Sequence, residues 1–130
     1  FYHNGSRWQE FWELAKNCLG ELEKQYTDGL CLIDVGAGCL KTEDALSYFT
    51  TQKTVVLVQD SSVHSFKRAS ARPGGYWGTK SLADYTKEEY SEERKRFYDA
   101  ATYKIDITGL NKDDAVVTFN RFISGLSLTK

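Results

Sequence analysis

The sequence predicts an α/β fold in which helices alternate with the strands of a parallel sheet. Two short apolar runs, Leu30–Val35 and Thr54–Val58, lack the alternation of half-exposed strands and are typical of strands covered on both faces. The stretches around them repeat apolar residues at three- and four-residue spacing, which indicates amphipathic helices. Strands that alternate with helices in this way form parallel sheets joined by right-handed crossovers.

The composition is that of one ordinary globular domain. Of 130 residues, 41% are apolar and 27% are charged, and the net charge of −1 argues against a broad nucleic-acid-binding surface. No apolar run approaches the roughly 20 residues of a membrane span. The three cysteines form no C-x-x-C pair, which favours reduced thiols in the cytoplasm. We therefore expect a cytoplasmic protein that binds neither nucleic acid nor a membrane.

The first element is predicted to be a helix over Arg7–Tyr26. Its apolar residues fall on one face, and Trp12 lies on that face, where core packing is the simplest role for the ring. The turn Asp28-Gly29 ends this helix and leads into Leu30–Val35. We expect that run to be the central strand of the sheet.

A glycine-containing turn, Gly36-Ala37-Gly38, follows this expected central strand and is the first candidate site. Ligands of open α/β sheets bind outside the carboxyl ends of the strands, and glycines let a ligand approach the backbone closely. The other interpretation is a simple strand-to-helix turn that binds nothing.

The chain after this turn is assigned to further helices and strands. Thr42 is expected to cap the first of these helices, and Ser61 or Ser62 the second. Thr86 and Glu89 form a predicted capping box at the start of the third. The predicted elements are helices over Lys41–Phe49, Val63–Arg68, Thr86–Thr102 and Lys112–Leu126, the strand Thr54–Val58, and a strand over Tyr103–Ile107 followed by a turn over Thr108–Asn111.

Residues 69–86 break this periodicity. The segment contains Arg72-Pro73-Gly74-Gly75 and then the aromatic pair Tyr76-Trp77. A segment of this length without regular structure is usually functional or mobile inside a compact domain, so we interpret it as a lid. A disordered surface loop is the alternative interpretation.

Arg94 lies within the apolar stripe of the predicted helix Thr86–Thr102, four residues before Tyr98. A half-buried guanidinium needs a carboxylate or phosphate partner. That partner is either a bound ligand or, in a purely structural ion pair, Glu13 or Asp34.

Five motifs in this order resemble those of the shikimate kinase family, and the resemblance runs nearly end to end. It implies a three-layer αβα fold around a parallel sheet, of the nucleoside-kinase-like, P-loop type. The motifs are Gly36-Ala37-Gly38, similar to the family's triple glycine; Arg68 at the end of the helix before the lid; Arg72-Pro73 at the start of the lid; Glu93-Arg94 followed by Tyr98 and Ala101; and the loop Asp106–Asn111.

The resemblance implies an ATP-dependent transfer of a phosphoryl group to a hydroxyl of shikimate or a related small acid. It also implies ATP and Mg²⁺ as cofactors, a monomeric state and, in a eukaryote, a plastid-type organelle as an alternative location. The implied roles are catalysis for Arg72, substrate binding for Gly36, Ala37, Gly38 and Arg94, and nucleotide binding for Arg68, Arg72, Gly109 and Asn111.

The chain departs from the family pattern in two respects. Trp12 stands where the family has a second substrate-binding Arg, and Ala15 replaces the family's Glu. No G-x-x-x-x-G-K-[ST] motif is present, so these 130 residues supply no phosphate cradle and no hydroxyl for Mg²⁺. Two alternatives to the kinase therefore stay open, namely a catalytically inactive ligand- or protein-binding relative and a kinase for a different small molecule.

The missing motif has a consequence for the sheet. In the resembled fold, the strand that leads into the phosphate loop lies between the strands matching Leu30–Val35 and Thr54–Val58. Without it, both runs would leave unpaired backbone groups. We expect either an upstream segment that carries this strand, or a sheet that closes differently.

Overall fold

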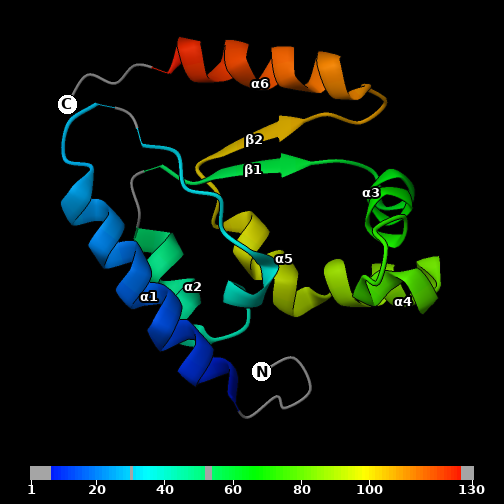
Figure 1. The fold of residues 1–130 in the computed structure, drawn as a ribbon, viewed down its shortest axis with the longest axis horizontal. Coiled ribbons are helices and arrows are strands. Elements are labelled where there is room, and N and C mark those ends of the chain that lie inside the picture. The colour runs from blue at the N-terminus through cyan, green and yellow to red at the C-terminus, as the bar shows by residue number, and fades with distance from the viewer. Residues whose placement is uncertain (1–6, 30, 52–53, 127–130) are drawn as a thin grey trace. The chain divides into compact units, whose positions relative to one another are not determined.

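The computed structural model describes residues 7–29, 31–51 and 54–126, and the chain divides into two compact units, Phe1–Gln52 and Lys53–Lys130. The described residues are mostly helical, with one parallel sheet of two strands in the C-terminal unit (Figure 1). The mixed α/β class that the sequence predicts is confirmed at this level.

The N-terminal unit contains the helices α1 (Trp8–Gln25) and α2 (Glu43–Thr51), with the short 3-10 helix η2 (Ala37–Cys39) between them. Both helices were expected from the apolar spacing, and Thr42 Oγ1 accepts a hydrogen bond from Ala45 N at 3.2 Å, as predicted for a cap.

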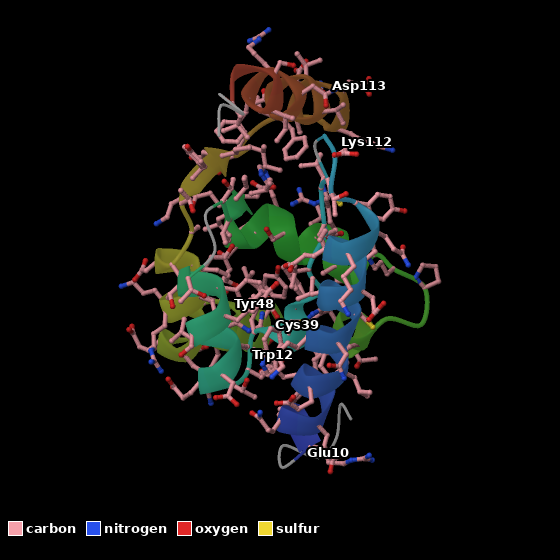
Figure 2. The ribbon with its side chains drawn as sticks, turned by 90° about the vertical axis from the view of Figure 1, so that its left-hand side faces the viewer. Glu10, Trp12, Cys39, Tyr48, Lys112 and Asp113 are labelled. Carbon is pink, nitrogen blue, oxygen red and sulfur yellow. The ribbon has the colours of Figure 1, made fainter. Side chains whose placement is uncertain are left out.

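The core of this unit is built around Trp12, whose side chain is 1% exposed. Its ring centroid lies 5.4 Å from that of Tyr48 and 5.9 Å from that of Phe49, and Figure 2 shows Trp12 and Tyr48 close together. Aromatic rings at these distances stabilise a core through edge-to-face contacts. The expected packing role of Trp12 is therefore confirmed.

The predicted central strand is wrong over its described part, Cys31–Val35. These residues form neither strand nor helix, and Leu32 and Ile33 are 57% and 38% exposed. Leu30 lies outside the described residues. The physical reason is the absence of a paired neighbour, because a strand exists only where a second strand satisfies its backbone groups, and the sheet of the described residues consists of two other strands.

The C-terminal unit contains a parallel pair of strands, β1 (Val56–Gln59) and β2 (Tyr103–Asp106), and both strands were expected. Val56 is paired with Tyr103 and Gln59 with Asp106, so the two carboxyl ends lie side by side. The chain between and after them forms α3 (Ser62–Ser70), the 3-10 helix η3 (Tyr76–Thr79), α4 (Leu82–Glu89), α5 (Glu92–Asp99) and α6 (Lys112–Gly125).

Helix α6 returns beside β2 (Figure 1). The ring centroid of Phe122 lies 5.4 Å from that of Tyr103. The Asn111 side chain caps this helix by accepting a hydrogen bond from Asp114 N at 2.8 Å. The predicted helix over Lys112–Leu126 is thus confirmed to within one residue at its end.

The single helix predicted over Thr86–Thr102 is wrong, because the segment contains parts of two helices. Ser81 and Asp84 form the capping box that starts α4, and Thr86 lies inside that helix. The Ser91 side chain accepts a hydrogen bond from Arg94 N at 3.2 Å and starts α5. Serine hydroxyls compete for backbone N–H groups, and this competition favours a new helix start over a continuous helix.

Residues 69–86, the predicted lid, contain more regular structure than expected. They include η3 and the first half of α4. The ring of Trp77 lies 4.7 Å from Tyr76 and 4.9 Å from Tyr85, and Tyr85 in turn lies 5.6 Å from Phe66 of α3. These aromatic contacts tie part of the segment to its neighbours, and its mobility stays a prediction.

Candidate functional site

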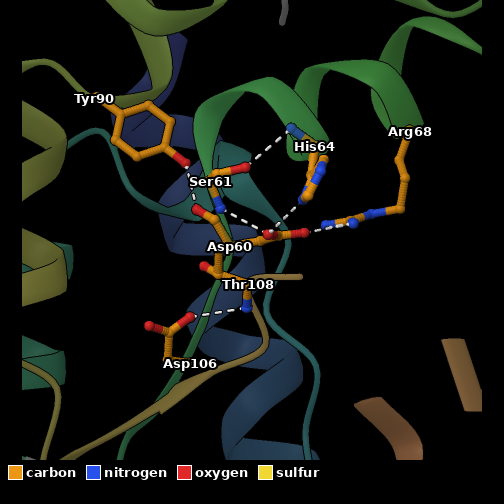
Figure 3. Close-up of polar contacts among 7 residues, drawn as sticks. All are labelled: Asp60, Ser61, His64, Arg68, Tyr90, Asp106 and Thr108. Atoms are coloured by element: carbon orange, nitrogen blue, oxygen red, sulfur yellow. Dashed lines mark hydrogen bonds and ion pairs between the residues drawn. The ribbon is translucent and has the colours of Figure 1, made fainter. Parts of the chain in front are cut away.

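Asp60 occupies the carboxyl end of β1, where the strand gives way to α3. Ser61 donates its backbone N–H to Asp60 Oδ1 at 2.7 Å, and Arg68 Nη1 lies 2.6 Å from Oδ2 (Figure 3). His64 Nδ1 lies 3.5 Å from Oδ1. Ser61 is also the N-cap of α3, as predicted. Helix α3 and its N-cap therefore place one amide, one imidazole and one guanidinium around a single carboxylate.

Opposing effects set the ionisation of Asp60, whose side chain is 4% exposed. Burial alone would raise the pKa of this carboxyl, but the hydrogen bonds from Arg68 and Ser61 and the nearby positive charge lower it below 3.8 overall. The carboxylate is therefore ionised at neutral pH and holds the Arg68 guanidinium at this edge, although the Arg68 side chain itself is 59% exposed.

The neighbouring loop, Asp106–Asn111, lies at the carboxyl end of β2. Ile107 donates its backbone N–H to Gln59 O at 2.9 Å, which continues the strand pairing by one residue. Thr108 N donates to Asp106 Oδ1 at 2.8 Å, and Gly109 has a φ of 80°, a left-handed conformation that favours glycine.

Asp106 is held ionised by its own loop. Hydrogen bonds from the side chain and backbone of Thr108 lower the pKa of Asp106, against a smaller opposing effect from the negative charge of Asp60. The two carboxylates therefore influence each other across adjacent strand ends.

Tyr90 connects this edge to the junction of α4 and α5. Its hydroxyl donates a hydrogen bond to the backbone carbonyl of Asp60 at 3.1 Å (Figure 3). We call Asp60, His64, Arg68, Tyr90 and the loop Asp106–Asn111 the edge site.

Three residues with an implied nucleotide-binding role lie in the edge site, namely Arg68, Gly109 and Asn111. Arg72 lies outside it, exposed in the turn after α3, where its carbonyl accepts a hydrogen bond from Gly75 N at 3.1 Å. Among the described residues, no hydrogen bond or ion pair of the edge site includes Arg72.

Arg94 is 4% exposed and its Nη1 lies 3.1 Å from Glu89 Oε2. An ion pair of the structural kind is thus present, but its partner is Glu89 and neither Glu13 nor Asp34, and the substrate-binding role of Arg94 stays a prediction. Within the described residues, Arg94 Nε is buried without a hydrogen-bond partner. The charge of Arg94 is compensated inside the α4–α5 hairpin.

The turn Gly36-Ala37-Gly38 lies in the N-terminal unit, where Cys39 N donates to Gly36 O at 3.0 Å. A Cβ atom added to Gly38 would come within 3.2 Å of the Phe11 ring and 3.5 Å of the Trp8 ring. A Cβ on Gly36 would meet nothing within 4 Å. Close packing against α1 thus explains the glycine at position 38.

The residues that sequence reasoning missed are Asp60, His64 and Tyr90. A signal for Asp60 was present, because the polar stretch Gln59–Ser62 follows directly after a buried strand, and polar groups at that place line the carboxyl edge of a parallel sheet. Nothing local in the sequence pointed to Tyr90, which reaches this edge from another helix junction.

Two negative findings apply to residues 7–29, 31–51 and 54–126. No three His, Cys, Asp or Glu side chains gather there closely enough to hold a metal ion. None of the helices in this part of the chain combines the length and apolar character needed to cross a membrane. Compared with protein-family models, with curated proteins and with solved structures, the chain matches none of them.

Proposed function

We propose that the chain is a small-molecule phosphotransferase of the shikimate kinase type, with the three-layer nucleoside-kinase-like fold, and that the edge site holds the adenine nucleotide. The observation that carries the proposal is the pairing of β1 with β2. It brings Arg68 and the loop Asp106–Asn111 to one edge, and the sequence resemblance implies adenine contacts for both.

The chemistry of the edge site suits this role. Ligands of parallel sheets bind outside the carboxyl ends of the strands. A guanidinium that is fixed by a carboxylate, as Arg68 is by Asp60, offers a flat cationic surface on which an aromatic base stacks. Arg72, exposed in the turn after α3, would reach the phosphates in this proposal.

Phosphoryl transfer needs more than these residues provide. ATP and Mg²⁺ would supply the transferable group and its charge neutralisation. The 130 residues contain no G-x-x-x-x-G-K-[ST] motif, and the described residues hold no cluster fit for a metal. We therefore expect these 130 residues on their own to bind a nucleotide without phosphorylating shikimate, and we expect transfer to require a longer chain that also carries a phosphate loop. Detection of phosphorylated shikimate by ³¹P NMR with the 130-residue chain would contradict that expectation.

A second candidate function is ligand binding without transfer. The ion pair between Arg94 and Glu89 favours it, because an acidic substrate would have to compete with Glu89 for the guanidinium. Trp12, in place of the expected Arg, favours either this function or a kinase with a different substrate.

Calorimetric titration with ADP tests the nucleotide proposal. Arg68→Lys keeps a cation beside Asp60 but removes the planar surface, and we expect ADP affinity to fall about fivefold to tenfold, the scale of a lost cation–π contact. Lys67→Ala is the matched control, because Lys67 is an exposed cation on the same helix, and it should leave affinity unchanged. Failure of the unaltered chain to bind ADP, or equal losses in both variants, would refute the proposal.

Arg94→Lys distinguishes the two candidate functions. If Arg94 anchors an acid, shikimate affinity falls by about 1–3 kcal/mol, the range for a charge-assisted hydrogen bond, while the melting temperature stays nearly constant. If the pair with Glu89 is structural, the melting temperature falls and affinity does not change. Both quantities are measured on the same purified variant.

A further inference from the structure

The C-terminal unit contains a cavity of about 350 Å³ that shares Asp60 and Tyr90 with the edge site but is otherwise lined by other residues. Leu57 and Val58 of β1 supply aliphatic surface, and three tyrosines, Tyr85, Tyr90 and Tyr98, supply aromatic surface. The volume lies at the lower end of the range for small-molecule pockets, which is about 300–1,000 Å³. The cavity is therefore large enough for one small ring compound.

The charges around the cavity are balanced in pairs. Each carboxylate of the lining has a cation within 4 Å, so that an ionised ligand would find no uncompensated partner. The three pairs are Asp60 with Arg68 at 2.6 Å, Glu89 with Arg94 at 3.1 Å, and Asp99 with Lys104 at 3.9 Å. A neutral ligand avoids the cost of burying a charge here.

The polar groups of the lining include acceptor positions that are still open on Glu89. The Tyr90 hydroxyl donates to Asp60 O at 3.1 Å and the Tyr98 hydroxyl to Glu89 O at 2.8 Å, so both phenol protons are already used. Glu89 accepts from Arg94 through Oε2, and a carboxylate has about four acceptor positions in all. A bound molecule that brings its own donor therefore finds an acceptor on the Glu89 carboxylate.

Tyr85 and Tyr98 keep their protons in this environment. Burial raises the pKa of Tyr85, and the negative charge of Glu89 adds to the effect. Burial also raises the pKa of Tyr98, partly offset by the charge of Arg94. Their rings therefore stay neutral and available for stacking or edge-to-face contact.

We propose that this cavity binds a small neutral aromatic molecule that carries one O–H or N–H donor, with its ring against the tyrosines and its donor on the Glu89 carboxylate. The proposal does not depend on nucleotide binding at the edge site. It assigns a ligand class that differs from the acidic substrate implied by the sequence resemblance.

Four probes with the same ring test the ligand class on the full 130-residue chain. Phenol is neutral and carries a donor, anisole lacks the donor, benzoate is an anion and benzylamine is a cation. Titrations followed by NMR should show phenol binding about tenfold more tightly than each of the other three. Intermolecular NOEs between phenol and the tyrosine rings of the unaltered chain should locate it. Equal or tighter binding of benzoate or benzylamine, or no phenol binding at all, would overturn the proposal.

A pair of variants tests whether phenol binds in this cavity. Val58 lines the cavity and is 45% exposed, so Val58→Trp should fill the cavity and lower phenol affinity at least tenfold. Val63 of α3 is 55% exposed and does not line the cavity, so Val63→Trp should leave phenol affinity unchanged. Equal effects of the two substitutions, or NOEs to rings other than these tyrosines, would show that phenol binds elsewhere.

Discussion

Two apolar runs that look alike in the sequence behave differently in the molecule. Val56–Gln59 forms β1, paired residue by residue with β2. Cys31–Val35 has the same lack of alternation, yet forms no strand and exposes Leu32 and Ile33. The difference teaches that a non-alternating apolar run indicates strand-forming capacity, whereas the strand itself depends on a neighbour that satisfies its backbone groups.

The turns that follow the two runs also differ, because among the described residues only the turn after β1 lies beside the end of a second strand. The turn after β1 contains Asp60, which is fixed by Arg68 and Ser61 beside a second strand end. The turn after Val35 contains Gly36, around which a Cβ would meet no atom within 4 Å. A candidate ligand site thus forms where two paired strands end together, and the tests below compare matched positions between the two regions or within one of them.

The largest effect is expected from truncating a paired strand. Ile105 of β2 is 5% exposed, so Ile105→Ala should lower the free energy of unfolding by about 2–4 kcal/mol, through lost burial and a cavity. Ile33→Ala is the control; Ile33 is 38% exposed, and its replacement should change stability by less than about 1 kcal/mol. Urea unfolding followed by circular dichroism measures both, and equal losses would contradict the comparison.

The carboxylates that follow the runs provide the next test. Asp60→Asn should lower the free energy of unfolding by about 1.5–3 kcal/mol at pH 7, the range for hydrogen bonds to charged groups. The pKa of Asp60 is lowered in the folded state. Its contribution to the free energy of unfolding is therefore complete above pH 3.8, and is lost as the pH falls through the lowered pKa. The difference in stability between Asp60→Asn and the unaltered chain should therefore disappear in acid.

Asp34→Asn is the control for this experiment. Asp34 is exposed in the unpaired run, so the substitution should change the free energy of unfolding by no more than about 0.5 kcal/mol at every pH. Thermal melts across the acid range compare both variants with the unaltered chain. If the loss of stability in Asp60→Asn stays the same at every pH, the charge of Asp60 contributes nothing to stability.

The glycines after the unpaired run provide a smaller effect. Gly38→Val should destabilise the chain by about 1–3 kcal/mol, because the new side chain would crowd the rings of Phe11 and Trp8. Gly36→Val should be nearly neutral, since Gly36 has open space around it and an extended backbone with φ −65° and ψ 148°. Melting temperatures in the reverse order would refute the packing explanation for Gly38.

The mildest test alters no residue. Hydrogen exchange should be slowest at the amides of β1 and β2, and faster over Arg72–Lys80, where η3 is one short 3-10 helix. Cys31–Val35 should exchange fastest of the three, because these residues form no regular element. Protection over Arg72–Lys80 equal to that of β1 would rule out the lid interpretation.

Local patterns in the sequence were enough to predict most helices and both paired strands. Apolar spacing predicted α1 and α6, and the caps Thr42 and Ser61 were identified correctly because capping depends on three or four consecutive residues. The same rule would have located the start of α4, since Ser81 precedes Asp84 by three positions. That signal was overlooked in favour of Thr86.

Features that depend on distant contacts could not be predicted in the same way. The failure of Cys31–Val35 to form a strand follows from the lack of a paired neighbour in the part of the chain that the structure describes, and no local pattern records such a lack. Likewise, the position of Arg68 at the edge depends on its pairing with Asp60, and the choice of Glu89 as partner of Arg94 depends on the break between α4 and α5.

The pairing of β1 with β2 also constrains how the C-terminal unit folds. It joins residues such as Val55 and Thr102 that are 47 positions apart, whereas helices form from neighbours in the sequence. The entropy of closing such a loop has to be overcome before the strand contacts repay it. We therefore infer that α3, α4 and α5 can begin to form early, while the edge site is assembled in the last and slowest step of folding.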